Sequence, residues 1–213
     1  MAEKTYYIDM KTFSIKEAFH NSWELFKVHK KVLIISTLIL IAANIAGDSM
    51  RDNWSIWSGI LNLVFYVIGL WIMVGLLKIV ISIFDGGAPK VEELFAHNDL
   101  IWKYFLVTVC YGLIVFLGLV LLIVPGVYLL VKYIFAPLLV VDKGLSVSEA
   151  FKESARMTEG VKWKILKLAL VCILLIILGF IALGVGLLVS IPVVQLMYVS
   201  VYRRLSSIET AQV

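Results

Sequence analysis

Long apolar runs dominate the pattern of the chain, and most of them approach the length of a membrane-spanning helix. Such a helix needs about 20 predominantly apolar residues to cross a hydrocarbon core of about 30 Å. The runs cover residues 32–47, 56–84, 104–124, 127–141 and 168–202. The last run would be about 52 Å long as one helix, so we predict two helices that separate near Gly179–Gly186. The pattern therefore predicts six spans, with a tight turn at Pro125–Gly126 between the third and the fourth.

Composition agrees with an integral membrane protein. Apolar residues make up 62% of the 213 residues, against about 45–50% in a soluble domain, and the mean hydropathy is +0.99. Charged residues make up 16%, which is too few to cover a globule in water, so a soluble enzyme is excluded. Cys110 and Cys172 both lie inside apolar runs and do not form the disulfide framework of a secreted domain.

The distribution of positive charge predicts the orientation. Six lysines precede residue 32, five cations lie between residues 143 and 164, and Arg203 and Arg204 follow the last run. Arg51 is the only cation in a loop that we assign to the outside. Cytoplasmic loops are rich in Lys and Arg, so we expect a multi-pass protein of a cell membrane, in prokaryotes the inner membrane, with both termini cytoplasmic. The net charge of +4 indicates attraction to anionic inner-leaflet lipid and no nucleic-acid partner.

Two cytoplasmic segments, residues 14–33 and 146–165, resemble each other. Each begins with S-x-x-E, the pattern of a capping box, and continues as an amphipathic helix suited to the membrane interface. A weaker copy begins at Pro89. Six of the 20 aligned positions are identical, namely Ser14/Ser146, Glu17/Glu149, Ala18/Ala150, Phe19/Phe151, Ser22/Ser154 and Lys30/Lys162.

These copies predict an internal repeat in an all-α membrane bundle that forms a single domain. Its three units, at about 13–84, 89–142 and 145–204, would each comprise an interfacial helix followed by a transmembrane hairpin. The alternative is that any lysine-rich linker beside a membrane becomes amphipathic without true repetition.

The segment from Val124 to about residue 166 carries a family resemblance. Its features are Pro125–Gly126, Lys132, Pro137, Asp142 and the A-x-x-x-S of Ala150 and Ser154, followed by Gly160. It resembles a poorly characterised family of bacterial and archaeal six-helix membrane proteins, which are similar to the membrane domain of some glycerophosphodiester phosphodiesterases. The resemblance implies a fold and a membrane location. It implies no catalytic residue, because the phosphodiesterase domain has no counterpart in these 213 residues.

Lys132 is the first candidate ligand-binding residue. It lies about 10 Å inside the start of the predicted fourth span, by helical rise. A lysine at such depth costs about 2.5–3.5 kcal/mol on insertion scales, so it would face a cavity or a partner. The functional interpretation is a cation that holds an anionic lipid head group. The alternatives are an ammonium that reaches the nearer interface and one that bonds carbonyls freed near Pro137.

Asn62 and Gln195 are further candidate ligand-binding residues. Each is an uncharged polar residue within a predicted span, so its amide should point at a neighbouring helix. Both fit either helix–helix packing or a substrate pathway.

Missing motifs narrow the function. No Asp or Glu lies in the centre of a predicted span, which disfavours ion-coupled transport. His20, His29 and His97 are widely separated, so we expect no metal site, no cofactor and no catalytic residue. The sequence favours a non-enzymatic membrane protein that binds or moves an amphiphile, such as an anionic lipid, at the inner leaflet. Two alternatives remain: a scaffolding, regulatory or protective protein that acts through a protein partner or as a homo-oligomer, and a passive channel or carrier.

Overall fold

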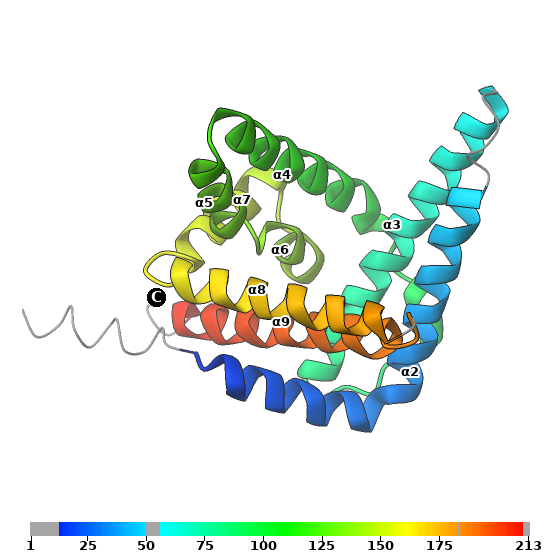
Figure 1. The fold of residues 1–213 in the computed structure, drawn as a ribbon, viewed down its shortest axis with the longest axis horizontal. Coiled ribbons are helices and arrows are strands. Elements are labelled where there is room, and N and C mark those ends of the chain that lie inside the picture. The colour runs from blue at the N-terminus through cyan, green and yellow to red at the C-terminus, as the bar shows by residue number, and fades with distance from the viewer. Residues whose placement is uncertain (1–12, 50–55, 183, 211–213) are drawn as a thin grey trace, which may run out of the picture.

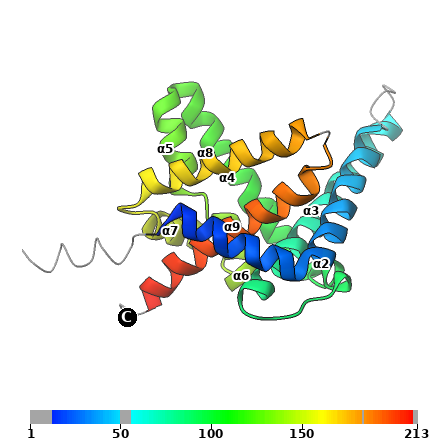
Figure 2. The same cartoon turned by 60° about the horizontal axis from the view of Figure 1, so that its bottom comes forward.

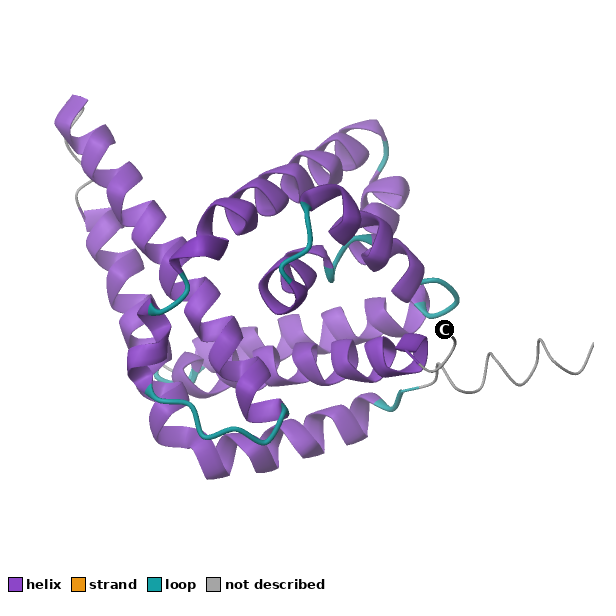
Figure 3. Ribbon diagram, turned by 180° about the vertical axis from the view of Figure 1, so that it is seen from behind, coloured by secondary structure: helices purple, strands orange, loops and turns teal. Residues whose placement is uncertain are grey.

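The computed structural model describes residues 13–49, 56–182 and 184–210, and within them every regular element is helical (Figures 1 and 3). Arg51 lies outside the described residues, so its predicted position in an outer loop is not addressed. The elements are α2 (Ile15–Ser49), α3 (Ile56–Phe84), η1 (Val91–Phe95), η2 (Asn98–Leu100), α4 (Ile101–Leu121), α5 (Ile123–Lys132), α6 (Ala136–Lys143), α7 (Val147–Met157), α8 (Lys162–Ile181) and α9 (Leu187–Thr210).

Five helical segments within the described residues are long and apolar enough to cross a membrane. They are Ile15–Gly47, Gly59–Phe84, Val91–Leu121, Ile123–Lys143 and Lys162–Ile181. The chain therefore has the character of a membrane protein. Helix α9 is not among the five, because Gln195 and the Arg203–Arg204 pair lower its hydropathy. The six-span arrangement and the cytoplasmic termini stay predictions. The Arg204 guanidinium group lies 3.4 Å from the Glu17 carboxylate, so the start of α2 lies close to the C-terminal part of α9.

Helix α2 changes direction at His29, where the backbone leaves helical geometry (φ −103°, ψ 17°). Figure 1 shows its first half lying beside α9 and its second half pairing with α3. In the first half the buried side chains are Ala18, Ser22 and Phe26, which recur every four residues on one face. The predicted interfacial helix and first span are therefore the two arms of one kinked helix.

The segment before α4 differs from its prediction. In place of an amphipathic α-helix, the structure has the short 3-10 helices η1 and η2. Asn98 and Asp99 interrupt the helical pattern there, since such side chains compete for backbone hydrogen bonds. Helix η1 packs closely on α3 at Gly75, where a Cβ atom would lie 2.1 Å from the Leu94 carbonyl oxygen.

The predicted capping box before α7 is confirmed. The Glu149 N–H donates to Ser146 Oγ (3.4 Å), and the Ser146 N–H donates to Glu149 Oε2 (2.9 Å). The hydrogen bonds from the side chain and backbone of Ser146 lower the pKa of the Glu149 carboxyl group. These bonds provide partners for backbone N–H groups at the first turn of α7. In the described part of the chain, α7 is the one predicted amphipathic segment that forms a separate α-helix.

The predicted fourth span is broken. Helix α5 ends at Lys132 and α6 begins at Ala136, because Pro137 has no N–H with which to continue the helical ladder and is tolerated only in a first turn. The turn predicted at Pro125–Gly126 lies at Leu122, in an extended conformation (φ −164°, ψ 147°). Pro125 occupies the first turn of α5, and Gly126 lets α5 approach α4 closely at Gly118.

The predicted break near Gly179–Gly186 is confirmed, since α8 ends at Ile181 and α9 begins at Leu187. Gly184 adopts a positive φ of 75° in this turn, a conformation that glycine reaches without strain. Gly179 and Gly186 bring the two helices close together: a Cβ atom on Gly186 would lie 2.6 Å from the Gly179 carbonyl oxygen.

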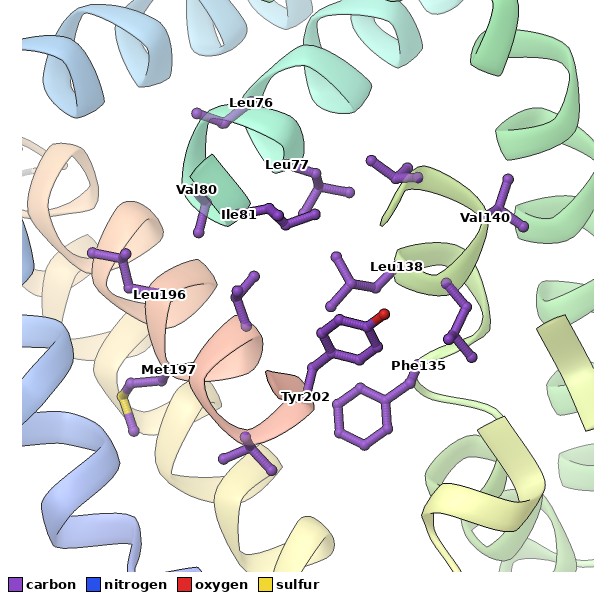
Figure 4. Packing of buried hydrophobic residues seen from close by; sticks show 14 of the residues in the cluster. Leu76, Leu77, Val80, Ile81, Phe135, Leu138, Val140, Leu196, Met197 and Tyr202 are labelled. Atoms are coloured by element: carbon purple, nitrogen blue, oxygen red, sulfur yellow. The ribbon is translucent and has the colours of Figure 1, made fainter. Parts of the chain in front are cut away.

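The apolar core lies where α3, α6 and α9 meet (Figure 4). The aromatic rings of Tyr198 and Tyr202 lie 5.3 Å and 6.0 Å from the ring of Phe135. The helices contribute Leu76, Leu77, Val80 and Ile81 from α3, Leu138 and Val140 from α6, and Leu196, Met197 and Tyr202 from α9, all buried. Figure 2 shows α9 running beneath α8, away from the α4–α5 pair.

The close approach at Gly186 predicts a position-specific effect on stability. Gly186→Ala should lower the free energy of unfolding by about 1–3 kcal/mol, the usual range for overpacking, because the added methyl group would meet the backbone of Gly179. Gly112→Ala is the matched control, since its Cβ would meet nothing within 4 Å. Unfolding in mixed detergent and SDS, followed by circular dichroism, measures both. Equal destabilisation by the two variants would contradict the prediction.

Candidate functional site

The break between α5 and α6 is held by side-chain hydroxyl groups. The carbonyl oxygen of Lys132 accepts hydrogen bonds from Ser154 Oγ and Thr158 Oγ1, both at 3.1 Å. The N–H of Phe135 donates to Ser154 Oγ at 3.2 Å. Ser154 lies on α7 and Thr158 directly follows it, and both are fully buried. Helix α7 therefore bonds the backbone on both sides of the break.

Two tyrosines complete this arrangement. The Tyr111 hydroxyl group on α4 donates to the Leu130 carbonyl oxygen at 3.0 Å, and the Tyr198 hydroxyl group on α9 donates to the Ile134 carbonyl oxygen. Non-helical backbone at membrane depth is tolerated only where protein or water satisfies it. The four hydroxyl groups meet this requirement and leave the carbonyl oxygens of Leu130, Lys132 and Ile134 without need of a bound ion.

An ion cluster joins the ends of α3, α6 and α9. The Arg203 guanidinium group bonds both oxygens of Asp142, at 2.9 Å and 3.0 Å, and Asp85 Oδ2 at 2.6 Å. The Tyr202 hydroxyl group donates to Asp142 at 2.5 Å. A two-point contact between Arg and a carboxylate fixes geometry as well as adding energy. The cluster therefore sets the register of three helices that are distant in sequence.

A groove of about 540 Å³ lies between α5 and the start of α8. Its walls are apolar, with Val124, Val127 and Val131 on α5 and Leu166 on α8. The groove is open along one side, and its volume falls within the range of typical small-molecule sites, about 300–1,000 Å³. The groove therefore combines apolar walls with one charged lining residue.

The charged group among the residues that line the groove is the ammonium group of Lys162. This group lies 5.0 Å from the centre of the Tyr128 ring, within the range of a cation–π contact, and beside the exposed indole of Trp163. Within the described residues Lys162 has no carboxylate partner. The first turn of α8 contains no acidic residue and has no side-chain cap, so the positive end of the helix adds to the same potential.

The structure places the three predicted residues in three different interfaces. Lys132 is half-buried at the end of α5, where its ammonium group lies 5.2 Å from the Tyr133 ring and it forms no ion pair with a described residue. Asn62 donates to the Gly47 carbonyl oxygen at 3.4 Å, between α2 and α3, beside a cavity of about 80 Å³. Gln195 donates to Met73 Sδ at 3.8 Å, and its buried Oε1 atom has no hydrogen-bond partner among the described residues. None of the three lines the α5–α8 groove.

The residues of the groove and of the break had only weak signals in the sequence. Ser154 and Lys162 are identical positions of the two aligned segments, and Asp142 belongs to the family resemblance. Neither pattern indicates which helix these side chains face, because the Ser154–Lys132 contact spans 22 residues and the Arg203–Asp142 contact 61 residues. Among the described residues, no three or more His, Cys, Asp or Glu side chains lie close enough together to hold a metal ion.

Comparison with protein families places this arrangement in a wider group. Residues 60–209 match a family model described as "Protein of unknown function (DUF975)". This chain belongs to the DUF975 family. The match includes the whole groove, the α5–α6 break and the ion cluster. It agrees with the expected poorly characterised family, while nothing links DUF975 to the glycerophosphodiester phosphodiesterases. No curated protein and no solved structure matches the chain.

The ion cluster predicts a large effect of a single carboxylate. Asp142→Ala should lower the free energy of unfolding of this DUF975 protein by about 1.5–3 kcal/mol, the range for hydrogen bonds to charged groups, because Arg203 and Tyr202 both lose a partner. Glu24→Ala is the control: its ion pair with Lys27 is half exposed on both sides, and such pairs contribute at most about 1 kcal/mol. Unfolding in SDS mixtures distinguishes the two. A loss for Asp142→Ala no larger than that for Glu24→Ala would refute the structural role of the cluster.

Proposed function

We propose that this DUF975 protein is a non-enzymatic membrane protein that binds an anionic amphiphile at the inner leaflet. The acyl chain would lie in the α5–α8 groove, and the anionic head group would contact the Lys162 ammonium group. The observation that carries the proposal is the combination of an apolar groove of about 540 Å³ with one cation, Lys162, among its lining residues. An amphiphile has the same combination of an apolar body and a charged end.

Head-group charge, rather than the acyl chain, would provide selectivity. A chain that leaves the bilayer for an apolar groove exchanges one apolar environment for another, so the hydrophobic effect contributes little. An anion that reaches Lys162 gains a Coulombic contact close to apolar walls, where the effective dielectric constant is below that of water. Binding should therefore depend strongly on Lys162 and weakly on the identity of the wall residues, provided that the groove stays open.

The first half of α2 supports a location at the inner leaflet. Its exposed surface combines aromatic and basic side chains: the rings of Phe19 and Trp23 stack with centres 6.3 Å apart, and Lys16 is exposed. Lys30 and Lys31, directly after the bend at His29, are exposed as well. Each lysine near an anionic surface contributes about 1 kcal/mol of attraction. This composition is typical of a helix that lies in the interface and would concentrate anionic lipid near the groove.

A cleft of about 500 Å³ beside α7 favours a second candidate function, the binding of a protein partner. It is lined by Lys143, Leu145, Glu149, Lys152, Glu153 and Arg156. Glu153 already pairs with Arg156 at 2.7 Å and with Lys143 at 3.6 Å, and Glu149 is engaged in the capping box. The cleft therefore retains an excess of positive charge and would suit an acidic segment.

Native mass spectrometry tests the lipid proposal. The protein would be reconstituted with equal amounts of phosphatidylglycerol and phosphatidylcholine and released from mild detergent. We expect the wild type to retain phosphatidylglycerol and Lys162→Leu to retain about tenfold less, equivalent to about 1.4 kcal/mol. Lys162→Arg should keep the preference. Lys132→Leu is the matched control, because Lys132 is also cationic and beside a tyrosine ring but does not line the groove.

Filling the groove provides an independent arm of this test. Val127→Trp should reduce lipid retention, because the indole would occupy the space between α5 and α8. Val120→Trp is its control, since Val120 on α4 is largely exposed and outside the groove. Equal retention of phosphatidylglycerol and phosphatidylcholine by the wild type, or equal loss from Lys162→Leu and Lys132→Leu, would overturn the proposal.

A further inference from the structure

Helix α7 connects the two walls of the α5–α8 groove. One wall is α5, whose last residue is hydrogen-bonded through its carbonyl oxygen to Ser154 of α7 and to Thr158, the residue that directly follows α7. The other wall is the start of α8, which follows α7 after a four-residue turn. A displacement of α7 would therefore move the two walls relative to each other.

The geometry of the turn supports this connection. Gly160 has a positive φ of 82° and itself lines the groove. The Val161 N–H donates to the Thr158 carbonyl oxygen at 3.2 Å, and the Ile165 N–H donates to the Val161 carbonyl oxygen at 3.1 Å. The turn is therefore a compact link between Thr158, which contacts α5, and the first turn of α8.

The other hydroxyl groups at the break do not make this connection. Tyr111 holds α5 to α4, and Tyr198 holds the break to α9. None of the residues that line the groove lies on α4 or α9. Among the described side chains that bond the break, only Ser154 and Thr158 lie in the segment that leads directly into α8, the opposite wall of the groove.

We propose that Ser154 and Thr158 are positioning residues that set the width of the groove, so that the docking of α7 controls access of the amphiphile. This inference rests on the proposed function for the identity of the ligand, but its geometric part is measured without ligand. Helix α7 also packs into the core through Ala150 and Met157, so the two hydroxyl groups fix where α7 sits against the end of α5, while its outer face stays exposed. That outer face carries the exposed cations Lys152 and Arg156.

The test measures a distance across the groove in the full-length protein. Spin labels are attached to Val124→Cys on α5 and Leu170→Cys on α8, in a chain with Cys110→Ala and Cys172→Ala. Both labelled positions are exposed. Double electron–electron resonance in lipid nanodiscs then compares this background with the added double variant Ser154→Ala and Thr158→Val. We expect a broader distribution with a longer mean distance in the double variant.

Two further variants separate positioning from a general loss of stability. Thr37→Val removes another fully buried hydroxyl group, which bonds the Leu33 carbonyl oxygen at 2.8 Å within α2, and should leave the label distance unchanged. Thr158→Ser keeps the hydroxyl group and should preserve the wild-type distribution. Ser154→Ala alone serves where the double variant does not fold, and should produce the same change to a smaller extent.

The label distance and the lipid measurement decide different questions. An unchanged distance distribution in the folded Ser154 and Thr158 variants, or the same change in Thr37→Val, would overturn the positioning role. In unlabelled protein, the double variant should release bound phosphatidylglycerol at least several-fold faster than the wild type. A wild type that binds no anionic lipid would overturn the proposed function, and with it the control of access, while the distance measurement would still decide whether α7 sets the spacing of the walls.

Discussion

The structure depends on one requirement: every backbone N–H and C=O group in an apolar environment needs a hydrogen-bond partner. Most of the chain meets it with helices. The segment between Lys132 and Ala136 cannot, because Pro137 interrupts the ladder. Hydroxyl groups from α4, α7 and α9 bond the exposed backbone there. The break is thus the point at which helices from three parts of the sequence must come together.

Other features of the fold follow from this convergence. Because α6 is a separate helix from α5, its apolar side chains pack between α3 and α9. Phe135, directly before α6, lies against Tyr198 and Tyr202 of α9 (Figure 4). The Arg203–Asp142 contact then closes the opposite end of α6 onto α9. Helix α5 is ten residues long, and the groove lies between it and the start of α8.

The chemical character of the groove follows from which residues border it. Apolar side chains cover its walls, and its one charged lining residue is Lys162, the first residue of α8. Other charged groups of the same region are already engaged: Glu153 with Arg156 and Lys143, and Asp142 with Arg203. Lys162 is the charged residue among those that line the groove, and such a cation would distinguish an anionic amphiphile from bulk lipid.

The sequence by itself determined the membrane character, the approximate position of the apolar helices, the break between α8 and α9 and the cap at Ser146, because each of these depends on residues within one or two helical turns of each other. It did not determine that α5 and α6 separate, that the segment at Pro89 forms only short 3-10 turns, or that Lys162 rather than Lys132 borders the groove. Those features depend on contacts such as Ser154 with Lys132 and Arg203 with Asp142. Hydropathy and spacing describe which face of a helix is apolar, whereas only the packing of distant helices decides which surfaces meet and which cation is left facing a cavity.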